Sequence, residues 1–263
     1  MALIQEFEES GNFLFKYRGQ IPVVIFLMAL PILFFSNSNV YFSWAVGELQ
    51  LVRLLSVIIG IVLSSLGFAV RCYTIGTTPH GTSGRNTQNQ VAEQLNTTGI
   101  YSIVRHPLYL GNYFMWAGLL TFTMNIWCFI IVSLMYWLYY ERIMLAEEQF
   151  LTKKFGKMYT DWSMTVPSFL PAFSQFKKSD IPFSFKAVLR REYSSFLSMV
   201  VAYTLVDYLL AIILKLYNSP VLSLVDYFHR PSMYVLLVTV IVVLVLRTLK
   251  HHTRFLDPEK NRD

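Results

Sequence analysis

Six long runs of apolar residues dominate the chain, separated by polar connections of very different length. The runs lie at residues 21–35, 54–70, 109–123, 126–140, 196–216 and 233–246. Such runs are typical of α-helices that satisfy their backbone hydrogen bonds internally and lie in a lipid bilayer. We therefore predict an all-α fold, a polytopic integral membrane bundle of about six apolar helices.

The third and fourth runs are separated only by Met124 and Asn125. Such a short connection joins neighbouring antiparallel helices. We expect a helical hairpin over residues 109–140. Each arm is shorter than the roughly 20 residues of a full crossing, so the pair is predicted to be re-entrant or barely spanning.

The composition supports a membrane location. Hydrophobic residues make up 54% of the 263 residues and charged residues only 14%, against about 25% charged in a typical soluble domain. This argues against an ordinary soluble enzyme and against intrinsic disorder. The chain has only two cysteines, Cys72 and Cys128, and both lie in or beside apolar runs. Two cysteines cannot form a disulfide scaffold or a four-cysteine zinc site. We predict no metal site.

The distribution of positive charge predicts the orientation. If all six runs cross and the N-terminus is cytoplasmic, the inner segments carry 19 of the 22 Lys and Arg residues. These segments are 1–20, 71–108, 141–195 and 247–263. The positive-inside rule then places both termini and the active site on the cytoplasmic side. No small-residue cleavage site follows the first run, so we expect no signal peptide, and we expect neither nucleic acid nor an obligate protein partner.

A long polar connection over 76–111 leads into the third run. It contains Arg105 and His106 directly before Pro107, which is well placed as a first helical residue. The free N–H groups of that helix start, beside two basic side chains, suit a carboxylate or a phosphate. The alternative is that these residues only anchor a helix end at the interface. Arg85, in the glycine-rich part, could contact a phosphate or belong to a flexible connector.

Carboxylates follow the hairpin. Glu147 and Glu148 lie where the apolar run gives way to a polar segment, and they either serve a site or form a solvated helix face. Asp207 lies inside the fifth run. An intramembrane carboxylate is a functional candidate, with a structural partner such as Tyr203 or a hydroxyl of a neighbouring helix as the alternative.

An ordered set of short motifs resembles a known family. The motifs are Gly99-Ile100-Tyr101, Val104-Arg105-His106-Pro107-Leu108-Tyr109-Leu110-Gly111, Glu147-Glu148, Phe155-Gly156, Tyr159 and Val166-Pro167 with Leu170-Pro171. Together they are similar to the membrane methyltransferases related to isoprenylcysteine carboxyl methyltransferase and phospholipid methyltransferases. The resemblance covers roughly residues 54–171. It divides the chain into an N-terminal segment with a first membrane helix (1–53), a methyltransferase core (54–171) and an extension with two further helices (172–263).

The resemblance implies S-adenosylmethionine as the methyl donor, bound in a cytosol-facing pocket above a lipid-facing tunnel. The residues that match donor-binding positions of the family are Gln94, Leu95, Asn96, Tyr101, His106, Pro107, Tyr109 and Glu147. Aromatic faces and a carboxylate suit a sulfonium cation, and helix-terminal N–H groups suit a carboxylate.

The acceptor side departs from the family pattern. The substrate-side arginine of the family, four residues before the glutamate, falls on Ile143, and the nearest basic residue is Arg142. Candidates for the acceptor site are therefore Arg142, Arg85 and Glu148. The catalytic residue stays unassigned, with Arg105, His106 and Arg142 as candidates. An ionised oxygen needs no general base, whereas an amine acceptor would bring His106, Glu147 and Glu148 into consideration as bases.

The basic extension and the loop at Arg85 favour a large anionic lipid headgroup, as in the bacterial members that methylate the 1-phosphate of lipid A. A prenylated cysteine carboxylate and phosphatidylethanolamine are alternative acceptors. A transporter or a non-catalytic membrane anchor are alternatives of another class. The apolar runs carry few charges, which argues against a transporter. A membrane anchor without catalysis would not need the long polar connection over 76–111.

Overall fold

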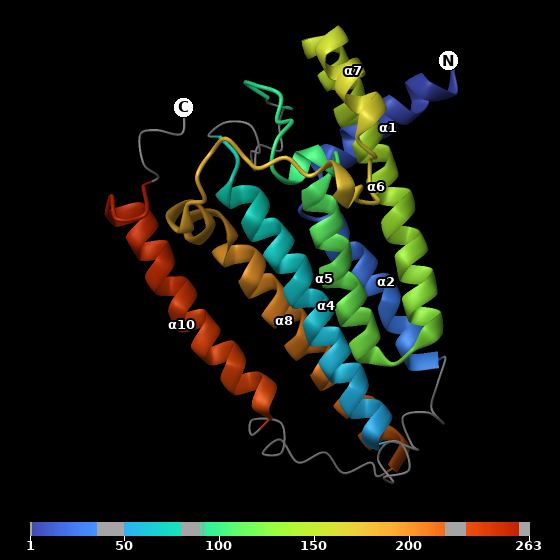
Figure 1. The fold of residues 1–263 in the computed structure, drawn as a ribbon. Coiled ribbons are helices and arrows are strands. Elements are labelled where there is room, and N and C mark those ends of the chain that lie inside the picture. Colours follow the sequence, from blue (N-terminus) through green and yellow to red (C-terminus); the bar gives the residue numbers. More distant parts are fainter. Residues whose placement is uncertain (1, 36–49, 80–89, 91, 219–229, 258–263) are drawn as a thin grey trace.

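Figure 1 shows the computed structural model of the chain, which describes residues 2–35, 50–79, 90, 92–218 and 230–257. The described residues form helices and connections without a β-sheet. The α-helices are α1 (Leu3–Lys16), α2 (Ile21–Phe35), α4 (Gln50–Gly76), α5 (Pro107–Thr123), α6 (Ile126–Phe155), α7 (Lys157–Thr165), α8 (Phe185–Asn218) and α10 (Pro231–His252). Short 3₁₀ turns cover Ile100–Ser102 and Phe173–Gln175. The prediction of a helical membrane bundle is confirmed.

The number of helices that can cross a membrane is smaller than the number of apolar runs. Four helices are long and apolar enough to cross a membrane: α4, α6, α8 and α10. A fifth crossing is possible if α1 and α2, bent by 91°, count as one broken span. Each of the six apolar runs is helical, but α5 has only 17 residues. The predicted six apolar helices are therefore present, and four or five of them count as crossings.

The ends of the hairpin explain why α5 is short. Pro107 begins the helix, and Met124 ends it in a left-handed conformation with φ of 51°. Asn125 then caps α6, because its side-chain oxygen accepts a hydrogen bond from Cys128 N at 2.9 Å. The polar segment continues α6 to 30 residues. The predicted hairpin forms, but its second arm is longer than expected and carries Glu147 and Glu148.

Glycines let α4 and α5 approach closely. A Cβ atom on Gly67 would lie 2.4 Å from Gly111 O, and one on Gly118 would lie 2.3 Å from Gly60 O. Neither contact leaves room for a side chain. Small residues at such crossings bring two membrane helices into backbone contact.

Polar side chains attach α8 to its neighbours. Tyr203 donates a hydrogen bond to Gly60 O at 2.8 Å and lies 2.8 Å from Ser64 Oγ on α4. Asp207 accepts hydrogen bonds from both Arg230 and Ser232 at the start of α10. These contacts agree with the structural alternative for Asp207. Ser232 is the hydroxyl of a neighbouring helix, and the second partner is Arg230 instead of Tyr203.

The polar parts of the molecule gather at one end of the bundle. Figure 1 shows α1, α7, the connection before α5 and the C-terminal end of α10 at the same end. Many large apolar side chains of α4 and α10 are exposed along their length, as expected for helices that face lipid. The start of α5, which follows Arg105 and His106, lies at this polar end.

Candidate active site

The start of α5 is held in place by the polypeptide that follows α7. Arg105 N donates to Pro167 O at 2.9 Å, and His106 N donates to Ser168 O at 3.2 Å. Pro107 is the first helical residue, where its missing N–H costs no hydrogen bond. The proline-containing segment after α7 therefore fixes the position of the two basic residues before α5.

A cluster of charges joins the start of α5 to α6. His106 lies with Nε2 2.9 Å from Glu148 Oε1 and with Nδ1 3.6 Å from Glu147 Oε2. Arg105 Nε lies 3.0 Å from Glu148 Oε1. Tyr109, one turn into α5, donates its hydroxyl to Glu147 Oε1 at 2.7 Å. The sequence-predicted residues of two distant segments thus meet in one cluster.

The two carboxylates raise the pKa of His106. Burial by itself would lower the pKa of His106, but the hydrogen bonds and charges of Glu147 and Glu148 outweigh burial and raise this pKa above its usual value. Burial and the charge of Glu147 also raise the pKa of Tyr101. The environment of the site therefore favours the protonated imidazole of His106 and the neutral phenol of Tyr101.

A cavity of about 940 Å³ extends from this cluster between the helices. It lies near the upper end of the size range of small-molecule sites, roughly 300–1,000 Å³. All eight residues predicted to bind the donor line it: Gln94, Leu95, Asn96, Tyr101, His106, Pro107, Tyr109 and Glu147. Residues between 94 and 109 and the distant Glu147 of α6 therefore line the same cavity.

The other predicted site residues have different positions. Arg105 lines the cavity, while Glu148 holds His106 and Arg105. Arg142 packs with its guanidinium 3.3 Å from the centre of the Phe7 ring on α1 and is not among the cavity-lining residues. Arg85 lies outside the described residues.

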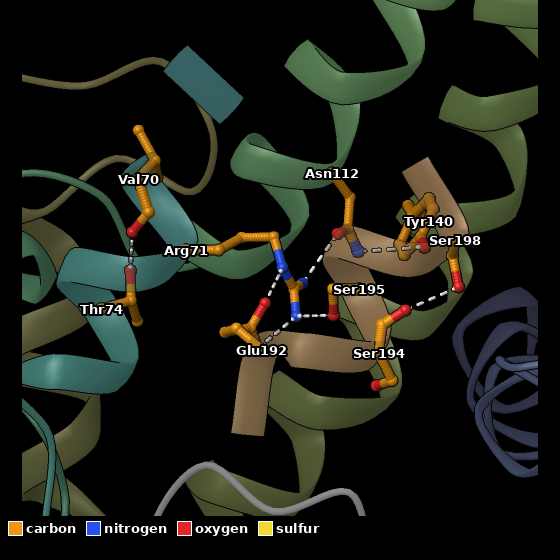
Figure 2. Close-up of polar contacts among 9 residues, drawn as sticks. All are labelled: Val70, Arg71, Thr74, Asn112, Tyr140, Glu192, Ser194, Ser195 and Ser198. Carbon is orange, nitrogen blue, oxygen red and sulfur yellow. Dashed lines mark hydrogen bonds and ion pairs between the residues drawn. The ribbon is translucent and has the colours of Figure 1, made fainter. Parts of the chain in front are cut away.

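Several residues of the cavity were not predicted. Arg71 of α4, Asn112 of α5 and Glu192 of α8 form a hydrogen-bonded group in the cavity wall, shown in Figure 2. Arg71 directly follows the second apolar run and Glu192 shortly precedes the fifth. Charged residues so close to membrane helices are candidates for functional residues, and this signal could have been used. Nothing in the sequence, however, indicates that Arg71 and Glu192 are in contact.

The deeper part of the cavity is apolar. Further along the helices from the charge cluster, its lining includes Trp116 and Leu119 of α5, Leu205 of α8 and Phe26 of α2. The cavity therefore combines a polar end with an apolar arm inside the bundle. Within the described part of the chain, no group of three or more His, Cys, Asp or Glu side chains could hold a metal ion.

Comparison with known proteins shows a family similarity in the middle of the chain. Residues 55–158 match the phospholipid methyltransferase family. The chain is 31% identical over 115 residues to a protein-S-isoprenylcysteine O-methyltransferase of Schizosaccharomyces pombe, which covers 41% of this chain and 48% of the relative. A second such enzyme, from Xenopus laevis, is 30% identical over 131 residues, or 47% of this chain and 43% of the relative. This chain thus spans less than half the length of these two relatives.

A differently named relative covers more of the chain. A nickel-cobalt-cadmium resistance protein of Alcaligenes xylosoxydans xylosoxydans is 28% identical over 166 residues, which is 63% of this chain and 70% of the relative. No solved structure matches the chain significantly.

Proposed function

Because this chain belongs to a family of membrane methyltransferases, we propose that it transfers a methyl group from S-adenosylmethionine to an anionic oxygen of a lipid or lipidated acceptor. One observation carries the proposal. The residues that match donor-binding positions of the family line one cavity, and the cavity continues into an apolar arm.

The cavity residues fit the proposed donor. When bound, S-adenosylmethionine supplies a methyl group on a positively charged sulfur. Glu147 and the rings of Tyr101 and Tyr109 offer negative charge and aromatic faces to such a cation. Residues 94–96 and the start of α5 at Pro107 would hold the remaining polar parts of the donor.

The charge of the cavity favours an anionic acceptor. Its lining contains four arginines, Arg18, Arg71, Arg105 and Arg191, but only two glutamates, Glu147 and Glu192. The hydrogen bonds and charges of Glu147 and Glu148 raise the pKa of His106 and so favour its protonated form, which cannot accept a proton. An ammonium group would need to lose a proton before it could attack, whereas a carboxylate or phosphate oxygen is already ionised. This favours O-methylation over methylation of phosphatidylethanolamine.

The chain's own residues then act by position and by exclusion of water. The charge cluster at His106 fixes the start of α5, and the apolar arm offers a place for a hydrocarbon chain. Alignment of acceptor and donor in a dry cavity supplies most of the rate enhancement of a displacement that needs no proton transfer. Among anionic acceptors we propose a phosphorylated glycolipid such as lipid A with its 1-phosphate, with a prenylated cysteine carboxylate as the second candidate. The active site and both termini are proposed to face the cytoplasm.

Donor binding tests the proposal directly. Calorimetry with the detergent-solubilised protein should detect binding of S-adenosylmethionine and of its demethylated product, S-adenosylhomocysteine. Glu147→Gln should weaken both by about tenfold to a hundredfold, since it removes one charged hydrogen-bonding group. Glu141→Gln, an exposed position on the same helix, is the matched control and should change nothing. If neither ligand binds the folded protein, the transporter alternative takes the place of this proposal.

Lipid mass spectrometry tests the acceptor. Lipids from cells with and without the gene are compared, and a phosphorylated glycolipid should gain the mass of one CH₂ when the protein is present. A gain confined to ethanolamine lipids would overturn the preference for an anionic oxygen.

A further inference from the structure

A buried pair of charges links α4 to α8 in the cavity wall, and donor binding does not account for it. Arg71 donates from Nε and Nη2 to the two carboxylate oxygens of Glu192, each at 2.8 Å (Figure 2). It also donates from Nη1 to Asn112 Oδ1 at 2.7 Å and from Nη2 to Ser195 Oγ at 3.3 Å. The side chains of Arg71 and Glu192 are only 13% and 3% exposed. All four residues line the cavity.

This pair lies next to the charge cluster around His106. Asn112 is one turn after Tyr109 on α5, and its Nδ2 donates to Tyr140 OH at 3.4 Å. The Tyr140 ring lies 4.8 Å from the Tyr109 ring, and Tyr109 contacts Glu147. The pair is therefore one layer deeper in the bundle than Glu147. Beyond it, α5 and α8 contribute mainly apolar side chains to the cavity, such as Trp116 and Leu205.

The pair presents hydrogen-bond donors to the cavity. A guanidinium has five N–H groups, and four hydrogen bonds of Arg71 use Nε, Nη1 and Nη2. Of the described residues, none offers an acceptor to the second N–H of Nη1. The Asn112 carbonyl oxygen is already used by Arg71. A surface with a spare donor and a permanent positive charge suits an oxyanion and disfavours an ammonium group.

No arginine of α6 is available for this task. The position at which the resemblance places a substrate-side arginine is Ile143, which is fully buried, and Arg142 packs on Phe7 of α1. Arg71 instead lies at the boundary between the polar end and the apolar arm. If the hydrocarbon chain of a lipid occupied the apolar arm of the cavity, the headgroup of that lipid would lie at the level of Arg71.

We propose that Arg71 binds the anionic headgroup oxygen of the acceptor and that Glu192 is a positioning residue that fixes the plane of the guanidinium. The inference rests on the proposed methyl transfer and adds a headgroup subsite to it. A carboxylate that accepts two parallel hydrogen bonds orients a guanidinium in a way that no single contact does. Glu192 lies outside the segment matched by the family, residues 55–158, so α8 contributes to acceptor choice.

The subsite can be tested with simple probes. The protein in phosphatidylcholine nanodiscs is titrated with lysophosphatidate, which has one chain and a phosphate headgroup, and with lysophosphatidylcholine. Binding is followed by the fluorescence of Trp116 and the other tryptophans. We expect a preference for lysophosphatidate, which Arg71→Gln reduces by about tenfold or more. Arg190→Gln, on α8 and paired with Asp257 away from the cavity, is the control and should keep the preference.

A double variant separates recognition from folding. Arg71→Gln alone leaves the buried Glu192 charge without its partner, which can unfold the protein. Arg71→Gln with Glu192→Gln removes both charges together. This variant should bind S-adenosylhomocysteine like the wild type but lose the preference for lysophosphatidate. Glu192→Gln alone keeps the Arg71 charge but loses the two parallel hydrogen bonds that orient the guanidinium, so it should weaken the preference for lysophosphatidate without abolishing it.

The possible failures are distinguishable. Wild-type preference for lysophosphatidate in the double variant would overturn the role of Arg71, and so would the lack of any preference in a wild-type protein that binds S-adenosylhomocysteine. If the wild type binds lysophosphatidate through Arg71 but binds no S-adenosylhomocysteine, the methyl-transfer proposal fails and a lipid-headgroup site remains.

Discussion

At the scale of the residue, His106 is the centre of the charge cluster. Its two ring nitrogens face two carboxylates, at 2.9 Å from Glu148 and 3.6 Å from Glu147. The side chain is only 6% exposed. Because the neighbouring carboxylates stabilise the imidazolium more than burial destabilises it, the pKa of His106 rises on folding.

This raised pKa predicts a pH dependence of stability. A group whose pKa is higher in the folded state adds stability that is complete below its unfolded pKa, about 6.5, and is lost as the pH rises through the folded value. The detergent-solubilised protein should therefore become less stable as the pH rises above about 6.5. Thermal unfolding from pH 6 upward measures this loss.

His106→Gln should remove this part of the pH dependence, so the wild type and the variant should converge at higher pH. A difference in melting temperature that is constant across the pH range would contradict the bound proton at His106.

At the scale of the element, the contact between α4 and α5 determines the geometry of the cavity. The two helices cross at Gly60 and Gly118 and again at Gly67 and Gly111. One turn beyond the second crossing, Arg71 of α4 bonds Asn112 of α5. A change in the distance between these helices would therefore be transmitted to the proposed headgroup subsite.

Gly118→Ala tests this contact. The added Cβ would lie 2.3 Å from both Gly60 O and Ser64 Oγ, so the helices must separate. We expect the free energy of unfolding to fall by about 1–3 kcal/mol, as for other overpacked cores. Thermal or denaturant unfolding in detergent measures the change. Gly19→Ala, at a position with no neighbouring atom within 4 Å, is the control. Equal effects of the two variants would contradict a tight crossing.

At the scale of the whole molecule, the bundle has one polar end. The start of α5, α1, α7 and the C-terminal end of α10 lie together there, and the turn between α5 and α6 lies at the opposite end (Figure 1). Together with the excess of Lys and Arg in the polar segments, this arrangement favours a cytoplasmic active site.

Labelling of single cysteines tests the orientation. In a background without native cysteines, Lys157→Cys on α7 and Thr253→Cys after α10 should react with a membrane-impermeant maleimide only after the membrane is permeabilised. Ile126→Cys, exposed at the turn of the hairpin, should react in intact cells. Reaction of Lys157→Cys in intact cells, with Ile126→Cys protected, would reverse the orientation.

The helical membrane class follows from the amino-acid sequence alone, because long apolar runs have few other stable structures. The motifs around His106 and Glu147 were likewise sufficient to select the residues that line one cavity. The sequence could not give the number of membrane crossings. The lengths of α5 and α6 depend on the left-handed conformation of Met124 and on the cap at Asn125.

Only the tertiary structure brought Arg71 and Glu192 together. They are 121 positions apart in the chain, and each alone is typical of a charge at a helix end near the membrane surface. Their pairing depends on the packing of α8 against α4, which is set by the close fit of side chains and not by a local pattern. For the same reason Arg142, the nearest basic residue in the sequence, packs on α1 instead of lining the cavity.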